Sequence, residues 1–281
     1  MNKRYRISGT IGWCDGVGYT ACMHAAYLVL ASLEGLTEYL PVSSTAHLIL
    51  AGKLFAVDLA DPYTKFYLLF IQLGALCAGV LLFTKRILTD RRLILNLIAS
   101  FVPTAILGFV FYASFKHLLE GNLPLMAAML VLGGVTFMYL EKVFMPRLAA
   151  KGEGGKDSLS MRDAVLVGIA QAIAIVPGVS RSGVTIVVGI LLGVRKAVIF
   201  EYTFFLALPT LGAAVAYDAY KSRDALMALS SYSDLIAGFA LSAVVGFLTL
   251  LVLRTYLPRM SLTAFGWYRI ALAAVIMVAM V

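Results

Sequence analysis

Two carboxylates lie four residues apart inside an apolar stretch of the chain. Glu34 and Glu38 are at positions i and i+4, so they would share one face of a helix. Such a pair suits a divalent cation, or a general base beside a metal ligand. A helix end at which both acids reach water is the alternative interpretation. The spacing therefore makes both residues candidates for metal binding and for catalysis.

Hydroxyl and imidazole groups follow within a few residues. The short segment after Pro41 carries Ser43, Ser44, Thr45 and His47. A histidine can activate a serine for nucleophilic attack or protonate a leaving group, which makes Ser44 and His47 candidate catalytic residues. A hydrogen-bonded packing role is the alternative for His47.

Arg181 lies in a second turn, which also follows a proline. A guanidinium is costly to bury in a membrane without a partner, and its planar fork matches two phosphate oxygens. Turn N–H groups near helix ends also suit an oxyanion. The neighbouring hydroxyl groups are those of Ser180, Ser182 and Thr185. This turn predicts phosphate binding; an ion pair of Arg181 with Glu34 or Glu38 is the alternative.

The composition indicates which kind of protein would carry these residues. Of 281 residues, 61% are hydrophobic and 14% are charged, whereas soluble domains are roughly 45–50% apolar and about 25% charged. We therefore expect an all-α polytopic membrane protein forming a single domain, residues 1–281. The net charge of +8 is read as a topology signal, because the aromatic–basic clusters typical of nucleic-acid binding are missing from the sequence.

Six segments are apolar enough for transmembrane helices, which need about 20 such residues. They are Phe66–Phe83, Leu93–Tyr112, Pro124–Phe144, Val198–Ala216, Leu235–Leu253 and Phe265–Val281. Two more apolar segments, Leu28–Leu50 and Ala164–Leu192, are interrupted by a proline followed by small hydroxylated residues. Near the start of the last span, the run Trp267, Tyr268 and Arg269 indicates an interfacial anchor.

The basic loops give the expected orientation. With these loops inside the cell, all six spans alternate without conflict. Ala164–Leu192 must then return to the side from which it enters. For Leu28–Leu50 we favour a re-entrant path from outside, although the basic N-terminus would then lie outside as well; a full crossing is the alternative.

The two interrupted segments resemble each other. Pro41 and Pro177 are 136 residues apart, and Gln72 and Pro209 in the following spans are 137 apart. Each half is then one re-entrant broken helix followed by three spans, so the second half is inverted, and such repeats place a polar site where the breaks meet. We predict repeat one at about residues 25–145, repeat two at about 160–281, and an extension at residues 1–24. Chance likeness of two apolar stretches is the alternative.

The strings EGLTEYLPVSSTAH (34–47) and PGVSRSGVT (177–185) resemble the bacterial undecaprenyl-diphosphate phosphatase (bacitracin-resistance) family, from about Ala25 to the C-terminus. The resemblance implies hydrolysis of undecaprenyl diphosphate to the monophosphate, which recycles the lipid carrier for cell-wall synthesis. It implies a Mg²⁺ or Ca²⁺ cofactor and a re-entrant, inverted-repeat fold in the bacterial plasma membrane. The family motifs fall on Glu34 and Glu38, on Ser43, Ser44, Thr45 and His47, and on Ser180, Arg181, Ser182 and Thr185.

In the expected mechanism, the diphosphate enters from the outer leaflet while its prenyl tail stays in lipid. Ser44 attacks the terminal phosphorus, or water does, with Glu38 or His47 as base. One or both of Glu34 and Glu38 hold the cation. A transporter and, more weakly, an anion channel are the rival classes. The sequence does not decide the oligomeric state; a homodimer is compatible with it.

Overall fold

The chain is helical throughout the part that the structure describes. The computed structural model describes residues 19–119, 122–150, 155–221, 223, 232–256 and 259–279, so most of the predicted extension, residues 1–24, lies outside the described residues. Within these ranges the β-structure is one isolated bridge between Lys156 and Val194. Five helices are long and apolar enough to cross a membrane: Pro62–Thr89, Arg91–Phe111, Leu123–Ala150, Lys196–Lys221 and Ser233–Tyr256. The prediction of an all-α, multi-pass membrane protein is confirmed at this level.

These helices extend beyond the apolar windows that predicted them. Helix α3 (Pro62–Thr89) begins at a proline, and the Asp61 side chain accepts a hydrogen bond from the Thr64 backbone N–H at 2.9 Å. The other long helices are α4 (Arg91–Leu119), α5 (Leu123–Tyr139), α9 (Lys196–Lys221) and α11 (Ser233–Tyr256). Helix α5 continues through a π-helical turn, η1 (Leu140–Phe144), into α6 (Met145–Ala150).

The sixth predicted span forms a helix of the predicted length that begins three residues earlier than expected. Helix α12 (Leu262–Val278) has 17 residues and begins at the Ser261 cap, whose side chain accepts from the Ala264 backbone N–H at 3.3 Å. About 20 residues are needed to cross the hydrocarbon core at right angles. The sixth crossing therefore stays a prediction.

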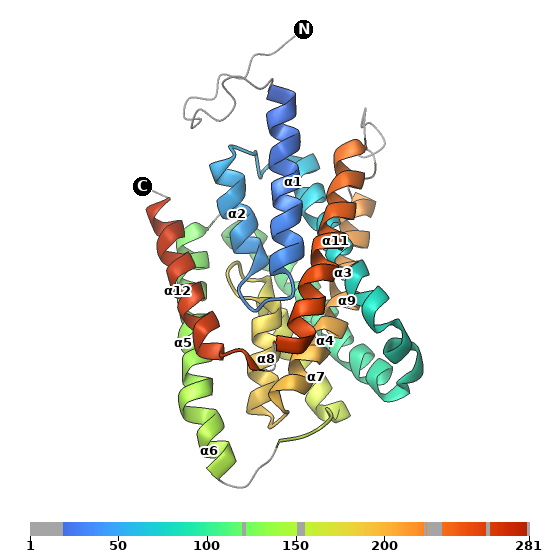
Figure 1. Ribbon diagram of the computed structural model, residues 1–281, viewed down its shortest axis with the longest axis vertical. Helices are drawn as coiled ribbons and strands as arrows, with labels where there is room; N and C mark the ends of the chain where they lie inside the picture. Colours follow the sequence, from blue (N-terminus) through green and yellow to red (C-terminus); the bar gives the residue numbers. More distant parts are fainter. Residues whose placement is uncertain are drawn as a thin grey trace.

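Each interrupted segment forms a helical hairpin that breaks where the prolines predicted. The first consists of α1 (Tyr19–Thr37) and α2 (Ser44–Leu54). The second consists of α7 (Met161–Gln171), a 3-10 turn η2 (Ala172–Ile175) and α8 (Arg181–Leu191). In Figure 1 the first hairpin reaches the middle of the molecule from one end and the second hairpin reaches it from the other. The two breaks therefore lie near each other at mid-depth.

Small residues allow each hairpin to pack closely on a long helix. Helix α1 lies along α11, and α7 lies along α4. A Cβ on Gly35 of α1 would come within 2.7 Å of the Ser242 carbonyl oxygen, and one on Gly168 of α7 within 2.7 Å of the Ser100 backbone. Close contact through small residues is typical of helix association in membranes. The outer face of α4 exposes Ile106 and Phe109, as expected for a surface facing lipid.

Candidate active site

The first hairpin turn is a tight, irregular segment. Pro41 lacks a backbone N–H and cannot continue the helix that ends at Thr37. Ser43 then adopts left-handed backbone angles, φ 70° and ψ 87°, which are uncommon for a residue with a side chain. This conformation turns the chain so that α2 begins at Ser44, with the Ser44 side chain on the wall of a cavity.

The second turn uses a glycine for its reversal. Gly178 has φ +87°, and a Cβ there would also come within 3.0 Å of the Met126 backbone, so both backbone angle and space favour glycine. Ser180 caps the following helix by accepting from the Gly183 backbone N–H at 3.1 Å, and its hydroxyl lies 3.0 Å from that of Ser182. Helix α8 therefore begins at Arg181.

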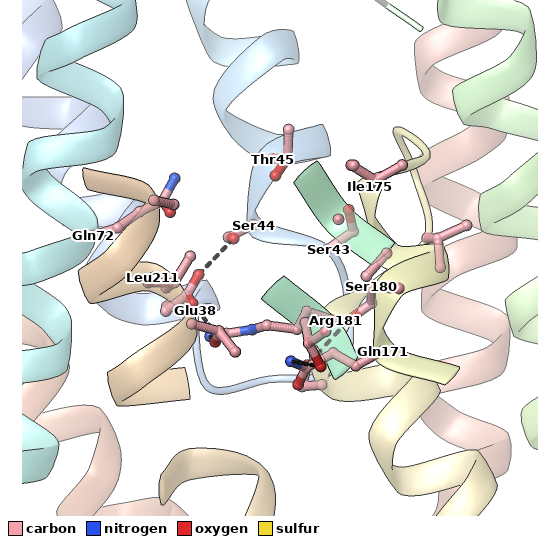
Figure 2. Close-up of a pocket in the computed structure, with 18 of the residues that line it drawn as sticks. Glu38, Ser43, Ser44, Thr45, Gln72, Gln171, Ile175, Ser180, Arg181 and Leu211 are labelled. Atoms are coloured by element: carbon pink, nitrogen blue, oxygen red, sulfur yellow. Dashed lines mark hydrogen bonds and ion pairs between the residues drawn. The ribbon is translucent and has the colours of Figure 1, made fainter. Parts of the chain in front are cut away.

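The two turns meet through Glu38, the second acid of the predicted pair. The Ser44 hydroxyl donates to Glu38 Oε2 at 2.8 Å, and Arg181 Nη2 forms an ion pair with Glu38 Oε1. Figure 2 shows Glu38 between Ser44 and the Arg181 guanidinium. The other Arg181 nitrogen donates to Thr210 Oγ1 at 3.4 Å. One carboxylate thus contacts both the candidate nucleophile and the candidate phosphate binder.

A cavity of about 290 Å³ lies beside this cluster. Seven of the ten predicted site residues line it: Glu38, Ser43, Ser44, Thr45, Ser180, Arg181 and Ser182. The rest of the wall combines apolar residues, such as Ile175 and Leu211, with further polar ones. A cavity whose wall combines charged, polar and apolar side chains suits a ligand with a charged head group and an apolar tail.

The other three predicted residues, Glu34, His47 and Thr185, do not line the cavity. The Thr185 hydroxyl donates to the Arg181 carbonyl at 3.0 Å and to Gln171 Oε1 at 3.3 Å. His47 is hydrogen-bonded at both ring nitrogens, to the Ser43 carbonyl oxygen at 2.8 Å and to the Tyr268 hydroxyl at 2.7 Å. The Ser44 hydroxyl donates to Glu38, and among the described residues the hydrogen-bond partners of the His47 ring are Ser43 and Tyr268 and do not include Ser44.

Glu34 has an unusual environment. Its side chain is fully buried, and neither carboxyl oxygen has a hydrogen-bond donor among the described residues. Its carboxyl group lies close enough to that of Glu38 to interact with it. An isolated buried carboxyl group is costly; either a hydrogen bond between the two acids or a cation held with Glu38 would satisfy it. Mg²⁺ is commonly bound by one or two carboxylates, with substrate phosphates and water as further ligands, so the two acids fit such an ion.

Several lining residues have no role in the sequence analysis. Gln171 Nε2 donates to Thr104 Oγ1 at 3.3 Å, and Thr210 accepts from Arg181. Thr104 and Thr210 each follow a proline inside an apolar helix, and this pair of features is a signal that could have identified them. Gln72, which the sequence analysis used only to align the two repeats, also lines the cavity.

One interpretation from the sequence is wrong. Arg269, read as part of an interfacial anchor with Trp267 and Tyr268, is 2% exposed, and its guanidinium donates to backbone carbonyls of both turns. The run of aromatic and basic residues suggested a position at the membrane surface. In the structure, helix α12 directs the Arg269 side chain toward α5 and the two turns. Trp267, by contrast, is exposed.

The site has the groups that a membrane-embedded phosphatase requires. A candidate hydroxyl nucleophile, a candidate carboxylate base and a guanidinium line one cavity in a multi-pass helical protein. The class is therefore a helical membrane hydrolase acting on phosphate groups.

Comparison with known proteins gives the family. A family model described as "Bacitracin resistance protein BacA" matches residues 27–275. Proteins named undecaprenyl-diphosphatase from Aquifex aeolicus and Thermus thermophilus are 36% and 38% identical over 88% of this chain and 95% and 94% of their own lengths. A third, from Dechloromonas aromatica, is 39% identical over 89% of this chain and 92% of its own. The chain belongs to the BacA family.

Proposed function

We propose that this protein hydrolyses the terminal phosphate of undecaprenyl diphosphate, giving undecaprenyl phosphate and inorganic phosphate. This reaction would recycle the lipid carrier for cell-wall synthesis and confer bacitracin resistance. The observation that carries the proposal is the cluster in which Glu38 contacts both Ser44 and Arg181 on the wall of the cavity. The names of the relatives support the identity of the substrate.

In the proposed membrane arrangement, six helices cross the bacterial plasma membrane and the two hairpins re-enter it from opposite faces. Two features support this arrangement: the opposed hairpins in Figure 1, and the matching contacts of α1 with α11 and of α7 with α4. These contacts would follow from inverted repeats, because α7 would correspond to α1 and α11 to α4.

The cavity is proposed to open toward the outer face. Its lining residues Gln72, Gly108 and Ala214 lie in the halves of α3, α4 and α9 that are remote from the basic loops. The basic loops carry residues such as Arg91 and Arg195, and an excess of basic residues marks the cytoplasmic side. The substrate head would therefore enter from the outer leaflet while its prenyl tail follows the apolar part of the wall into lipid.

The terminal phosphate is proposed to bind at the second turn. Arg181 offers two N–H groups in one plane, and Ser180 and Ser182 offer hydroxyl groups beside it. The N-terminal end of α8, which begins at Arg181, also favours an anion. Arg181 would then exchange part of its contact with Glu38 for contacts with phosphate oxygens.

In the proposed reaction, the Ser44 oxygen attacks the terminal phosphorus and its proton passes to Glu38. The bond between that phosphorus and the bridging oxygen breaks, and undecaprenyl phosphate leaves with the bridging oxygen. Water then hydrolyses the phosphoserine and releases inorganic phosphate. The 2.8 Å hydrogen bond from Ser44 to Glu38 makes Glu38 better placed than His47 to serve as the base.

A divalent cation is part of the proposal. Glu34 and Glu38 are the residues that would hold Mg²⁺ or Ca²⁺, and the ion would supply positive charge to the diphosphate when bound. The full burial of Glu34 and the closeness of its carboxyl group to that of Glu38 support this assignment.

The test is release of inorganic phosphate from undecaprenyl diphosphate by the purified protein in detergent, with and without a chelator. We expect phosphate release that a chelator abolishes and added Mg²⁺ restores, and that is absent in the Glu38→Gln variant. A transporter needs two compartments to function, whereas hydrolysis does not. Binding of the substrate without phosphate release would therefore favour transport and contradict the proposal.

A further inference from the structure

Arg269 is a buried arginine that the proposed chemistry does not use. Its side chain comes from α12 and is 2% exposed. Among the described residues its hydrogen-bond partners are all backbone carbonyl oxygens. Nη1 donates to Pro41 at 3.2 Å, Nη2 donates to Gly178 at 2.9 Å and to Met129 at 3.4 Å, and Nε donates to Leu130 at 3.4 Å.

Such a charge is costly to keep inside a membrane protein without a carboxylate partner. The partial negative charges of four carbonyl groups, and the face of the Phe137 ring 5.7 Å away, offset part of that cost. These hydrogen bonds also stabilise the two turns, because carbonyl groups outside a regular helix lack helical N–H partners and need other donors. Arg269 supplies a donor to one carbonyl in each turn.

The packing around Arg269 leaves room for its guanidinium. A Cβ on Gly133 of α5 would lie 2.8 Å from Arg269 Cζ, so any larger residue at this position would push the guanidinium away. The adjacent residue of α12, Tyr268, contacts the first hairpin through His47. Helix α12 therefore reaches both hairpins from one side.

The two carbonyls that Arg269 contacts lie close to the reacting groups along the chain. Pro41 precedes Ser44 by three residues, and Gly178 precedes Arg181 by three residues. One rigid, planar group thus joins the turn that carries the candidate nucleophile to the turn that carries the candidate phosphate binder. Its fork fixes the distance between its two donor nitrogens, which a lysine ammonium cannot do.

We propose that Arg269 is a positioning residue that sets the spacing between the two turns, and through them the placement of Ser44 relative to Arg181. The inference rests on the proposed phosphatase function. It does not make Arg269 a catalytic residue, because Arg269 does not line the cavity. Removing it should leave phosphate binding at the second turn largely intact and disturb the attack from the first turn.

The kinetic test compares Arg269→Lys and Arg269→Met with Arg254→Met, which alters an exposed arginine near the end of α11. With farnesyl diphosphate as substrate, we expect kcat to fall about 100-fold in both Arg269 variants, because misplacement by about 1 Å has an effect of that order. We expect KM to change less than about threefold, since Arg181, Ser180 and Ser182 all lie on one turn, and Arg254→Met to match the wild type.

A second variant keeps the arginine itself and moves its side chain. Gly133→Ala should displace the guanidinium, because the added Cβ would lie 2.8 Å from Arg269 Cζ, and should lower kcat by about tenfold without removing the charge. This variant guards against the case in which the Arg269 variants do not fold. A wild-type kcat in Gly133→Ala together with a wild-type kcat in Arg269→Lys would overturn the proposal.

A distance measurement separates this inference from the proposed function. Spin labels at Leu54→Cys and Leu191→Cys, which replace exposed residues at the ends of α2 and α8, report the separation of the two hairpins in a full-length chain with its native cysteines replaced. We expect a broadened or shifted distance distribution with Arg269→Met and an unchanged one with Arg254→Met. An unchanged distribution with Arg269→Met would overturn the positioning role, even if activity falls. A shifted distribution in a chain whose wild type releases no phosphate would support the positioning role and refute only the proposed function.

Discussion

The Glu38 carboxylate and the Arg181 guanidinium form an ion pair between residues that are 143 positions apart in the chain. The pair joins the ends of two hairpins that approach from opposite sides of the molecule. Because the second Glu38 oxygen accepts a hydrogen bond from Ser44, this carboxylate holds a nucleophile candidate and an anion-binding group in one arrangement. The same contact also explains how an arginine can be half-buried in an apolar protein.

Glu38→Gln should abolish most of the activity. The amide keeps the size of the side chain but can neither accept the Ser44 proton nor carry the charge that faces Arg181, so we expect kcat/KM to fall about 10²- to 10⁴-fold, the range for loss of a general base. Phosphate release measured over a series of Mg²⁺ concentrations checks this. Glu34→Gln is the matched comparison: it should weaken the Mg²⁺ requirement more than the maximal rate. Unchanged metal dependence in both variants would remove the two acids from the cation site.

Arg181→Lys should lose most of the activity although it keeps the charge. A lysine ammonium is a point charge and cannot make two parallel hydrogen bonds to phosphate, so we expect a loss in kcat/KM of about 100-fold, or about 2.7 kcal/mol of transition-state stabilisation. Arg254→Lys, at an exposed position, should match the wild type. Near-normal turnover of Arg181→Lys would show that Arg181 serves as the structural partner of Glu38 and does not hold the phosphate.

Ser44→Ala decides between attack by serine and attack by water. If Ser44 is the nucleophile, the variant should lose activity by about 10³-fold or more, while Ser32→Ala, remote from the cavity, should not. Acid quenching of the wild type with substrate labelled in its terminal phosphate should trap a phosphoserine, which mass spectrometry can assign to residue 44. A fully active Ser44→Ala variant with no trapped phosphoserine would establish water as the nucleophile.

The sequence predicted those features that depend on local patterns. The prolines at 41 and 177 placed both helix breaks, because each lacks a backbone N–H and is followed by small hydroxylated residues. Proline alone was not a sufficient signal, since Pro103 and Pro209 lie inside α4 and α9. The apolar windows located five long helices, whose ends lie outside those windows. The i, i+4 spacing of Glu34 and Glu38 and the run around Arg181 indicated which side chains to examine.

Contacts between segments that are distant in the chain could not be predicted from local sequence patterns. His47 was paired with Ser44 because the two are close in sequence, but the partner of its Nε2 atom is Tyr268, 221 residues away. Arg269 was read as an interfacial residue because basic and aromatic residues often lie there, whereas tertiary packing directs its side chain inward. Such partners depend on how helices pack, and one sequence does not specify that packing.

Gly108 offers a test of the path of the prenyl tail. It lines the cavity from α4, and a Cβ at this position would meet nothing within 4 Å, so a larger side chain would extend into open space without a clash. Gly212 of α9 is equally open but does not line the cavity, which makes it a matched control. The substitutions Gly108→Leu and Gly212→Leu should leave the melting temperature unchanged or raise it. Replacing a glycine inside a helix stabilises the folded protein by up to about 1 kcal/mol.

If the tail leaves the cavity past Gly108, then Gly108→Leu should lower kcat/KM for undecaprenyl diphosphate by about tenfold or more, as expected when a leucine side chain occupies space that an apolar ligand needs. Farnesyl diphosphate, whose shorter tail needs less of the path, should be affected less, and Gly212→Leu should affect neither substrate. Parallel phosphate-release assays on the two substrates measure this. Equal loss for both substrates would show that residue 108 blocks the diphosphate head, and no loss for either would place the tail along another wall of the cavity.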